Sequence, residues 1–320
     1  MAWLKGLAAM AAVAAAAAGV MFYHLFNLPN ERGTEVQLLI EKGAGSRRVA
    51  EQLAEAGVIS HPLLFRLAAR VSGLDKDLKA GEYVFLPGIS MREVLAIISR
   101  GEVHYRRLTL PEGLTTARML ELIRAEPNLA GEITIAAEEG ELLPETYSYV
   151  KGDSRDSIIR RARLAMEKTL EEAWRQNRRK VLKNRRQLLT LASIIEKETG
   201  VPEERADVAA VFINRLETGM KLQTDPTVIY ALTEGKKDLG RPLYRKDLSV
   251  ESPYNTYKYY GLPPGPICNP GREAIFAAVH PSDADYLYFV ASGMGGHRFA
   301  RSLKEHNRNV SLYKKAMKKK

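Results

Sequence analysis

A buried helix with two glutamates near its end is predicted in the second half of the chain. Residues 188–202 read Leu-Leu-Thr-Leu-Ala-Ser-Ile-Ile-Glu-Lys-Glu-Thr-Gly-Val-Pro. Apolar residues recur there three and four positions apart, which predicts a helix packed inside a core. Gly200 and Pro202 end the helix directly after its last carboxylate. We therefore expect this helix to lie at the centre of the larger domain of an α+β protein.

The two glutamates, Glu196 and Glu198, face different sides of this helix. At about 100° per residue, with Leu191 at zero, Glu198 falls near −20° and Glu196 near 140°. Glu198 thus lies on the apolar face, between Ile194 and Ile195. Burial and the negative end of the helix dipole both raise the pKa of a carboxyl group there. Such an acid suits cleavage of a glycosidic bond, but a buried structural glutamate explains the pattern equally well.

A second helix and a polar turn follow. The helix is expected to begin near Glu203 and Glu204 and to end at Gly219. The turn reads Gln-Thr-Asp-Pro over residues 223–226. Asp225 before Pro226 predicts an N-cap with proline at the first helical position. The less favoured alternative makes Asp225 a second catalytic carboxylate.

The loop over residues 252–271 is rich in proline, glycine and tyrosine, which predicts fixed turns. Its aromatic rings and amides suit sugar rings, because a sugar offers one apolar face and a rim of hydroxyl groups. A merely well-ordered loop is the alternative. The polar and aromatic residues are Tyr254, Asn255, Tyr257, Tyr259, Tyr260 and Asn269. Farther on, residues 286–291 predict a core strand, and His297 and His306 have no evident partners.

The N-terminus predicts a membrane anchor over residues 1–28. Residues 6–26 contain no formal charge except at His24, and such a helix is about as long as the hydrocarbon core is thick. A cleaved signal peptide is the alternative, but the apolar run continues to Phe26, farther than a cleavable segment usually does. Lys5 and the amino terminus are the only charges before it. We therefore expect the N-terminus inside the cell and the remaining chain outside the cytoplasmic membrane.

Two domains are predicted after the anchor, over residues 33–104 and 106–320. The first has strands at 35–40 and 82–86, helices from Ser46 and at 62–71, and a capping box of Ser90 and Glu93 that opens a helix to Arg100. It reads as a small α+β module, either a spacer or a carbohydrate-binding module. In the second domain, residues 153–187 predict a long basic helix, whose charges form a solvated face or contact anionic lipid or wall polymer.

Charge and composition limit the partners. The chain of 320 residues has 48 Lys+Arg against 38 Asp+Glu, a formal charge of +10. This suits nucleic acid, a membrane surface or an acidic polymer, and the anchor argues against nucleic acid. One cysteine, Cys268, excludes an internal disulfide framework, and the six histidines lack the spacing of a zinc site. We expect neither a metal nor another cofactor.

Several ordered motifs together resemble the YceG-like endolytic murein transglycosylases, the MltG family. These are residues 191–199, the Val-Phe-Ile-Asn-Arg-Leu run of 211–216, residues 219–230, Tyr254-Asn-Thr-Tyr257, Gly261-Leu-Pro-Pro-Gly265 and His280-Pro281. The first module looks like the LysM-like domain of that family, with a less specific match. The chain departs from the family pattern at Cys268 and in the basic tail Lys314–Lys320.

The resemblance implies a substrate and a reaction. The substrate is the glycan strand of peptidoglycan, cut internally at the β-1,4 bond between N-acetylmuramic acid and N-acetylglucosamine. One glutamate protonates the leaving oxygen and then accepts the proton of the muramic C6 hydroxyl, which closes a 1,6-anhydro ring. Glu198-Thr199 resembles the Glu-Ser pair of other lytic transglycosylases, which favours Glu198 over Glu196. The residues expected to bind substrate are Asn214, Gln223, Thr224, Asp225, Tyr254, Asn255, Tyr257 and Asn269.

The resemblance also implies a role near the peptidoglycan synthases, as further partners, in ending the elongation of nascent glycan. Two other readings remain. A muramidase would use Glu198 and Asp225 with water, since hydrolases use a pair of carboxylates. A non-catalytic wall-binding scaffold would bind glycan without cleaving it.

Overall fold

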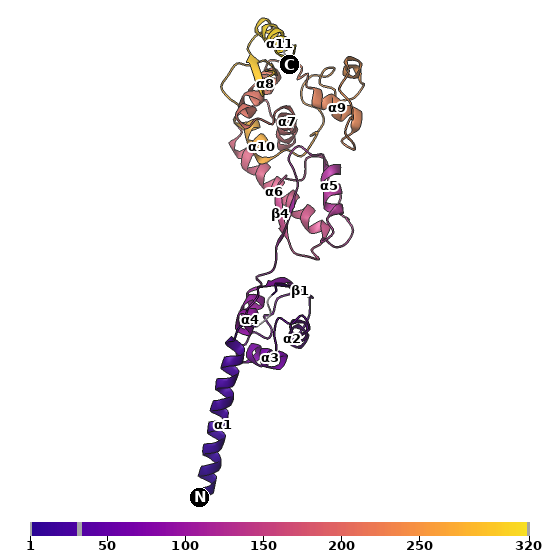
Figure 1. The fold of residues 1–320 in the computed structure, drawn as a ribbon. Coiled ribbons are helices and arrows are strands. Elements are labelled where there is room, and N and C mark those ends of the chain that lie inside the picture. Colours follow the sequence, from indigo (N-terminus) through magenta and orange to yellow (C-terminus); the bar gives the residue numbers. More distant parts are fainter. Residues whose placement is uncertain (1, 31–33, 319–320) are drawn as a thin grey trace. The chain divides into compact units, whose positions relative to one another are not determined.

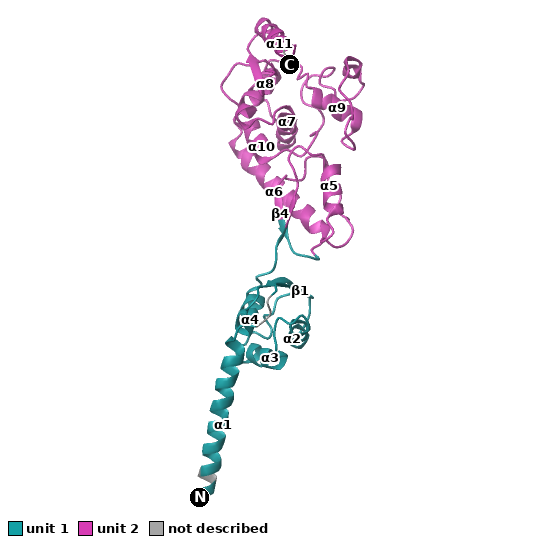
Figure 2. Ribbon diagram, viewed as in Figure 1, with its two compact units in different colours: residues 1–106, 148–152 teal, residues 107–147, 153–320 magenta. Residues whose placement is uncertain are grey.

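The protein is described by a computed structural model that covers residues 2–30 and 34–318 (Figure 1). The expected module start at residue 33 and the last residues of the basic tail lie outside this range. The chain forms two compact units (Figure 2): residues 1–106 with 148–152, and residues 107–147 with 153–320. It passes between them within two paired strands, β3 (Arg106–Thr109) and β4 (Thr146–Tyr149). Residues 148–152 thus join the first unit, whereas the sequence suggested one crossing near residue 105.

The first unit begins with one long helix, α1 (Ala2–Asn27). Its segment from Gly6 to Asn27 is long and apolar enough to cross a membrane, and none of that segment is buried inside the protein. Only the end of α1 packs on the unit, through Phe22, Leu25 and Phe26. Among the residues that the structure describes, the rest of its apolar surface from Gly6 to Met21 is therefore not buried by a protein partner.

The rest of the first unit is a small α+β module. A two-stranded antiparallel sheet pairs β1 (Val36–Ile40) with β2 (Gly81–Phe85). Three helices complete the module: α2 (Ser46–Glu55), α3 (Pro62–Val71) and α4 (Met91–Arg100). The capping box of Ser90 and Glu93 at the start of α4 is confirmed, since each side chain bonds the backbone of the other residue.

The second unit is organised around α7 (Arg185–Glu198). All residues from Leu188 to Ile195 are buried, so the predicted core helix is confirmed. Four helices pack against it: α6 (Arg155–Gln176), α8 (Arg205–Glu217), α9 (Asp225–Thr233) and α10 (Arg272–Val279). The remaining elements are α5 (Thr116–Ala125), η1 (Pro202–Glu204), η2 (Arg245–Ser249), the hairpin of β5 (Tyr288–Ala291) and β6 (His297–Ala300), and α11 (Leu303–Met317).

Two expectations for this unit are wrong. The helix expected over residues 153–187 ends at Gln176, where the backbone of Asn177 becomes extended, and α7 begins as a separate helix after its N-cap Asn184, whose side chain accepts a hydrogen bond from Gln187 N. The strand expected in the core, β5, is only half-buried. It pairs with β6 in a hairpin of two strands, and a sheet of two strands buries only one side of each.

Candidate active site

Glu198 ends α7, and the loop before α9 faces its carboxyl group. The hydroxyl of Thr224 donates a hydrogen bond to Glu198 Oε1. The residue keeps partial contact with solvent, yet burial raises the pKa of its carboxyl group, and the nearby Asp225 carboxylate raises it further. The Thr224 hydrogen bond and the charges of His297 and Arg215 act in the opposite direction. The raised pKa expected from the sequence is confirmed, with burial as its main cause.

Two other threonines, Thr227 and Thr256, hold the backbone of Thr224 in place. Thr227 donates its one hydroxyl proton to the Thr224 carbonyl oxygen over 2.8 Å. Thr256, 2.8 Å from the Thr227 hydroxyl, must therefore donate to it. Thr256 also accepts the backbone N–H of Thr224 over 3.1 Å. These bonds hold the backbone N–H and carbonyl of Thr224, and so fix the position from which its hydroxyl donates to Glu198.

The residue before Thr224 lies in an unusual conformation. Gln223 has φ 48°, in the left-handed region that residues with a side chain rarely adopt. Its backbone N–H donates to the Thr256 carbonyl over 3.2 Å, which holds the turn, and its side chain is exposed. Strained backbone of this kind concentrates at functional sites. Gln223 thus has an exposed side chain directly before Thr224, the residue that bonds Glu198.

Asp225 is not the N-cap that the sequence predicted. Thr224 occupies the N-cap position of α9, and Asp225 is the first helical residue. Its carboxylate accepts instead a 2.6 Å hydrogen bond from the Tyr257 hydroxyl. Asp225 stays exposed and lies near enough to Glu198 to raise its pKa.

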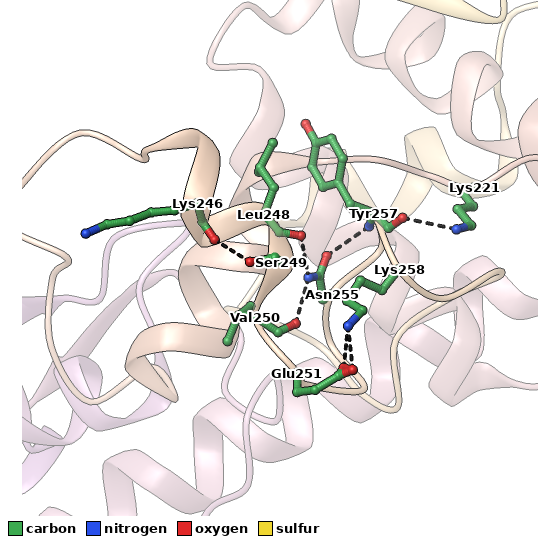
Figure 3. A network of polar contacts seen from close by, with 9 residues as sticks. All are labelled: Lys221, Lys246, Leu248, Ser249, Val250, Glu251, Asn255, Tyr257 and Lys258. Carbon is green, nitrogen blue, oxygen red and sulfur yellow. Dashed lines mark hydrogen bonds and ion pairs between the residues drawn. The ribbon is translucent and has the colours of Figure 1, made fainter.

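The loop over residues 252–271 is fixed by the side-chain amide of Asn255 (Figure 3). Asn255 is fully buried and donates to the carbonyl oxygens of Leu248 and Val250, at 3.0 and 2.8 Å. Its Oδ1 accepts the backbone N–H of Tyr257 over 3.0 Å, and Lys221 Nζ donates to the Tyr257 carbonyl. These bonds use the amide inside the protein. Asn255 therefore places Tyr257, and its own side chain has no free face for a sugar.

The two other asparagines also bond inside the protein. Asn214 donates to the Ala284 and Tyr286 carbonyls, each over 2.9 Å. Asn269 is fully buried; it accepts from Leu142 N over 2.9 Å and donates to the Leu114 carbonyl over 3.1 Å. Their amides join distant segments of the fold. The geometry thus separates the three asparagines from the more accessible Gln223, Asp225, Tyr254 and Tyr257.

Glu196 lies in a different environment, two residues before Glu198. Its Oε2 accepts the backbone N–H of Gly271 over 3.0 Å. Burial raises the pKa of this carboxyl group too, while the Gly271 hydrogen bond and the Arg205 charge lower it. Glu196 thus joins the start of α10 to α7, and it lies on the other side of the helix from the threonines.

A histidine that the sequence pattern did not single out, His297, lies near Glu198. His297 is not without a partner: its Nδ1 lies 2.7 Å from Glu204 Oε2, and its backbone N–H donates to Glu204 Oε1. Gly296 leaves room for this carboxylate, since a Cβ there would collide with Glu204. The pair Gly295-Gly296 directly before a histidine was the available indication. His306 stacks on Tyr288 with ring centroids 5.2 Å apart.

A buried arginine completes the surroundings. Arg215 donates to the Leu222 carbonyl over 2.6 Å and to the Leu287 carbonyl over 2.7 Å. It thereby joins the segment that leads to Thr224 with the segment that leads to β5. Within residues 2–30 and 34–318, no group of three or more His, Cys, Asp or Glu is placed to hold a metal ion.

Together these features define a mixed helix-and-strand domain whose central helix ends in a desolvated carboxyl group held by a hydroxyl donor. A family model described as the YceG-like family matches residues 38–312. This match covers most of the chain, and the chain belongs to the YceG-like family.

Relatives with curated names agree. An endolytic murein transglycosylase of Bacillus subtilis (strain 168) is 32% identical over 311 residues, which cover 88% of this chain and 85% of the relative. An endolytic murein transglycosylase of Streptococcus pneumoniae (strain D39) is 30% identical over 85% of this chain, which spans only 57% of that relative. The crystal structure of a yceG-like protein from Listeria monocytogenes matches 87% of this chain and 99% of its own, with 30% identity and a TM-score of 0.53.

Proposed function

We propose that this protein is an endolytic lytic transglycosylase that cuts the glycan strand of peptidoglycan. Relatives at 30–32% identity are named endolytic murein transglycosylases. The single structural observation that carries the proposal is the desolvated carboxyl group of Glu198, held by the Thr224 hydroxyl. A carboxyl group whose pKa is raised by burial stays protonated nearer to neutral pH, as a general acid must.

The proposed reaction needs one carboxyl group and no water. Glu198 gives its proton to the oxygen that links muramic acid to the next N-acetylglucosamine, and the C1–O bond breaks. The resulting carboxylate accepts the proton of the C6 hydroxyl, and O6 bonds to C1 of the same muramic sugar. The product is a 1,6-anhydro end, and Glu198 is protonated again. Thr224, bonded to Oε1, leaves Oε2 to carry the proton in both steps.

The accessible residues around Glu198 supply the sugar contacts in this proposal. Gln223 and Asp225 are exposed on the turn before α9, and Tyr254 and Tyr257 are half-buried on the facing loop. Amide and carboxylate groups suit sugar hydroxyls, while the tyrosine rings suit the apolar sugar face. We assign Asn214, Asn255 and Asn269 to holding these loops in place.

The proposal extends to the location of the protein. We propose that α1 anchors it in the cytoplasmic membrane, with the N-terminus inside and both units outside. The small α+β module would then be a LysM-like domain beside the membrane, which binds glycan or positions the catalytic unit. Peptidoglycan synthases would be partners there, and the basic surface would face anionic lipid. No nucleic acid is expected.

Purified sacculi test the proposal. We expect the wild-type protein to release fragments with 1,6-anhydro ends and Glu198→Gln to release almost none. Mass spectrometry distinguishes the reactions, because hydrolysis products retain one water that anhydro products lack. Glu196→Gln is the matched control, since it changes the neighbouring carboxyl group of the same helix. Normal cleavage by Glu198→Gln would overturn the assignment.

A muramidase is the second candidate, and the exposed Asp225 near Glu198 is the observation in its favour. Hydrolases place their second carboxylate so that it can activate water or attack C1. Products with the added water, lost in Asp225→Asn, would establish this alternative. Binding of glycan without any cleavage would establish a scaffold.

A further inference from the structure

The first unit carries an exposed apolar stripe on α3. Leu63, Leu67 and Val71 lie four residues apart and are 73%, 51% and 78% exposed. Residues with this spacing share one face of a helix and here extend over about 12 Å. Single exposed apolar residues are normal, but three in line form a face that lacks a partner. The opposite face of α3, with Phe65, is already buried in the core of the module.

The stripe lies beside the end of the proposed membrane helix. α3 contacts α1 directly, and both belong to the first unit (Figure 1). Beside this contact is a pocket of about 460 Å³, lined by Leu25 and Leu28 at the end of α1 and by Ile59 and His61 of the segment that leads into α3. The end of α1 and the segment before α3 thus share one pocket.

The charges on α3 fit a lipid surface. The helix carries Arg66 and Arg70 and no acidic residue. Arg70 is exposed, and Arg92 reaches the end of α1, with its Nη1 3.5 Å from Asn27 Oδ1. An amphipathic helix with leucines on one face and arginines beside them is typical of helices that lie in the membrane interface.

We propose that the Leu63–Val71 face of α3 inserts into the outer surface of the phospholipid bilayer beside α1. This inference rests on the proposed anchor, because the bilayer that receives α3 is the one that α1 crosses. The α3 stripe and the end of α1 then hold the module at two points. Attachment at two points restricts how the module is oriented relative to the membrane. Attachment through α1 alone would restrict this orientation less.

Fluorescence quenching in vesicles tests the proposal on the full chain. The one native cysteine, Cys268, is buried, so Leu67→Cys and Gln37→Cys each place a single accessible thiol for an environment-sensitive dye. Gln37 is the matched control, because it is exposed on β1, which lies away from α1 in Figure 1. The vesicles contain phosphatidylethanolamine, phosphatidylglycerol and lipids spin-labelled near the headgroup. We expect at least about twofold stronger quenching at residue 67 than at residue 37.

Flotation of the same samples separates this proposal from the anchor. Equal quenching at both positions in protein that floats with the vesicles overturns the α3 proposal and leaves the anchor intact. Protein that does not float overturns both. A disulfide-linked dimer of unlabelled Leu67→Cys in the vesicles also overturns the proposal, because a second copy of the chain then covers the face. Cleavage of sacculi at the wild-type rate by both variants confirms their folding.

Discussion

Glu196 and Glu198 lie on two sides of the end of α7, and their carboxyl groups differ in their hydrogen-bond partners. Glu196 and Glu198 are two residues apart, and burial raises the pKa of both. Glu196 accepts a backbone N–H, from Gly271, a donor that cannot move away. Glu198 accepts a hydrogen bond from the side-chain hydroxyl of Thr224. The residues on either side of Thr224, Gln223 and Asp225, are exposed. A raised pKa therefore marks both carboxyl groups, and only the surrounding groups distinguish a fold-stabilising residue from a candidate catalyst.

The largest expected effect separates the two glutamates by activity. Glu198→Gln cannot give or accept the proton, so we expect the rate of anhydro-end formation to fall roughly 10²- to 10⁴-fold. Glu196→Gln keeps a carbonyl oxygen for Gly271 N–H and should stay within about tenfold of wild type. Timed digestion of sacculi measures both rates. The reverse order of losses would transfer the catalytic assignment to Glu196.

Thr224→Val should have the next largest effect, because it removes the hydroxyl but keeps the shape. A hydrogen bond to a charged group is worth roughly 1.5–3 kcal/mol, which corresponds to about a 10- to 100-fold loss of rate. The hydrogen bond lowers the pKa of Glu198, so its loss should raise that pKa and shift the fall in activity to higher pH.

A pH–rate profile measures this shift, and Thr224→Ser is the control that should restore the wild-type curve. An unshifted profile in Thr224→Val would mean that the hydroxyl does not act on Glu198.

Glu196→Ala should affect stability more than chemistry. It leaves the partly buried N–H of Gly271 without its acceptor, at a cost of roughly 1–3 kcal/mol in the free energy of unfolding. Denaturant unfolding of the wild type, Glu196→Ala and Glu196→Gln measures the cost. If the alanine and glutamine variants lose the same stability, the Gly271 hydrogen bond is not the cause.

Glu198→Gln should change how the stability of the protein depends on pH. A carboxyl group whose pKa is raised by folding binds its proton more readily in the folded state. Its favourable effect is present at low pH and is lost as pH rises through the folded pKa. Glu198→Gln removes this loss, so its melting temperature relative to wild type should be higher at pH 8 than at pH 5. A difference that does not change with pH would contradict the raised pKa.

Gln223→Gly is expected to have the smallest effect on stability. Glycine adopts the left-handed conformation without a steric penalty, which should stabilise the fold by at most about 1 kcal/mol, less the extra freedom of the unfolded chain. Gln223→Ala keeps the strain and removes only the amide. If the amide contacts sugar, both variants should lose activity equally. Normal activity in both would restrict Gln223 to its backbone role.

Local rules made much of the fold predictable. The Ser90–Glu93 capping box, the buried face of α7 and the apolar N-terminal helix all depend on neighbours within one or two helical turns. One error occurred where a distant contact formed. Asp225 does not cap α9 because Tyr257, 32 residues later, binds its carboxylate. Hydrogen bonds between distant segments have no periodicity that a sequence pattern could reveal.

The asparagines of the candidate site show the same limit. Residue type predicted sugar contacts for Asn255 and Asn269, because an amide suits a hydroxyl group, and the family resemblance added Asn214. In the fold each is bonded to backbone groups of another segment, and Asn255 and Asn269 are fully buried. Conversely, His297 had no partner in the sequence and gained Glu204 in the fold. Residue type could identify candidate polar side chains, but it could not predict which of them stay accessible in the fold.

The sequence by itself determined the anchor-like helix, the central position of α7, the desolvation of Glu198 and the resemblance to the YceG-like family. Helical periodicity and contiguous motifs settle these properties, since both are local. The tertiary structure decided which hydroxyl meets Glu198, how Thr227 and Thr256 hold the backbone of Thr224, and which face of α3 stays exposed. These depend on side chains from segments that only folding brings together, and directional hydrogen bonds require positions in three dimensions.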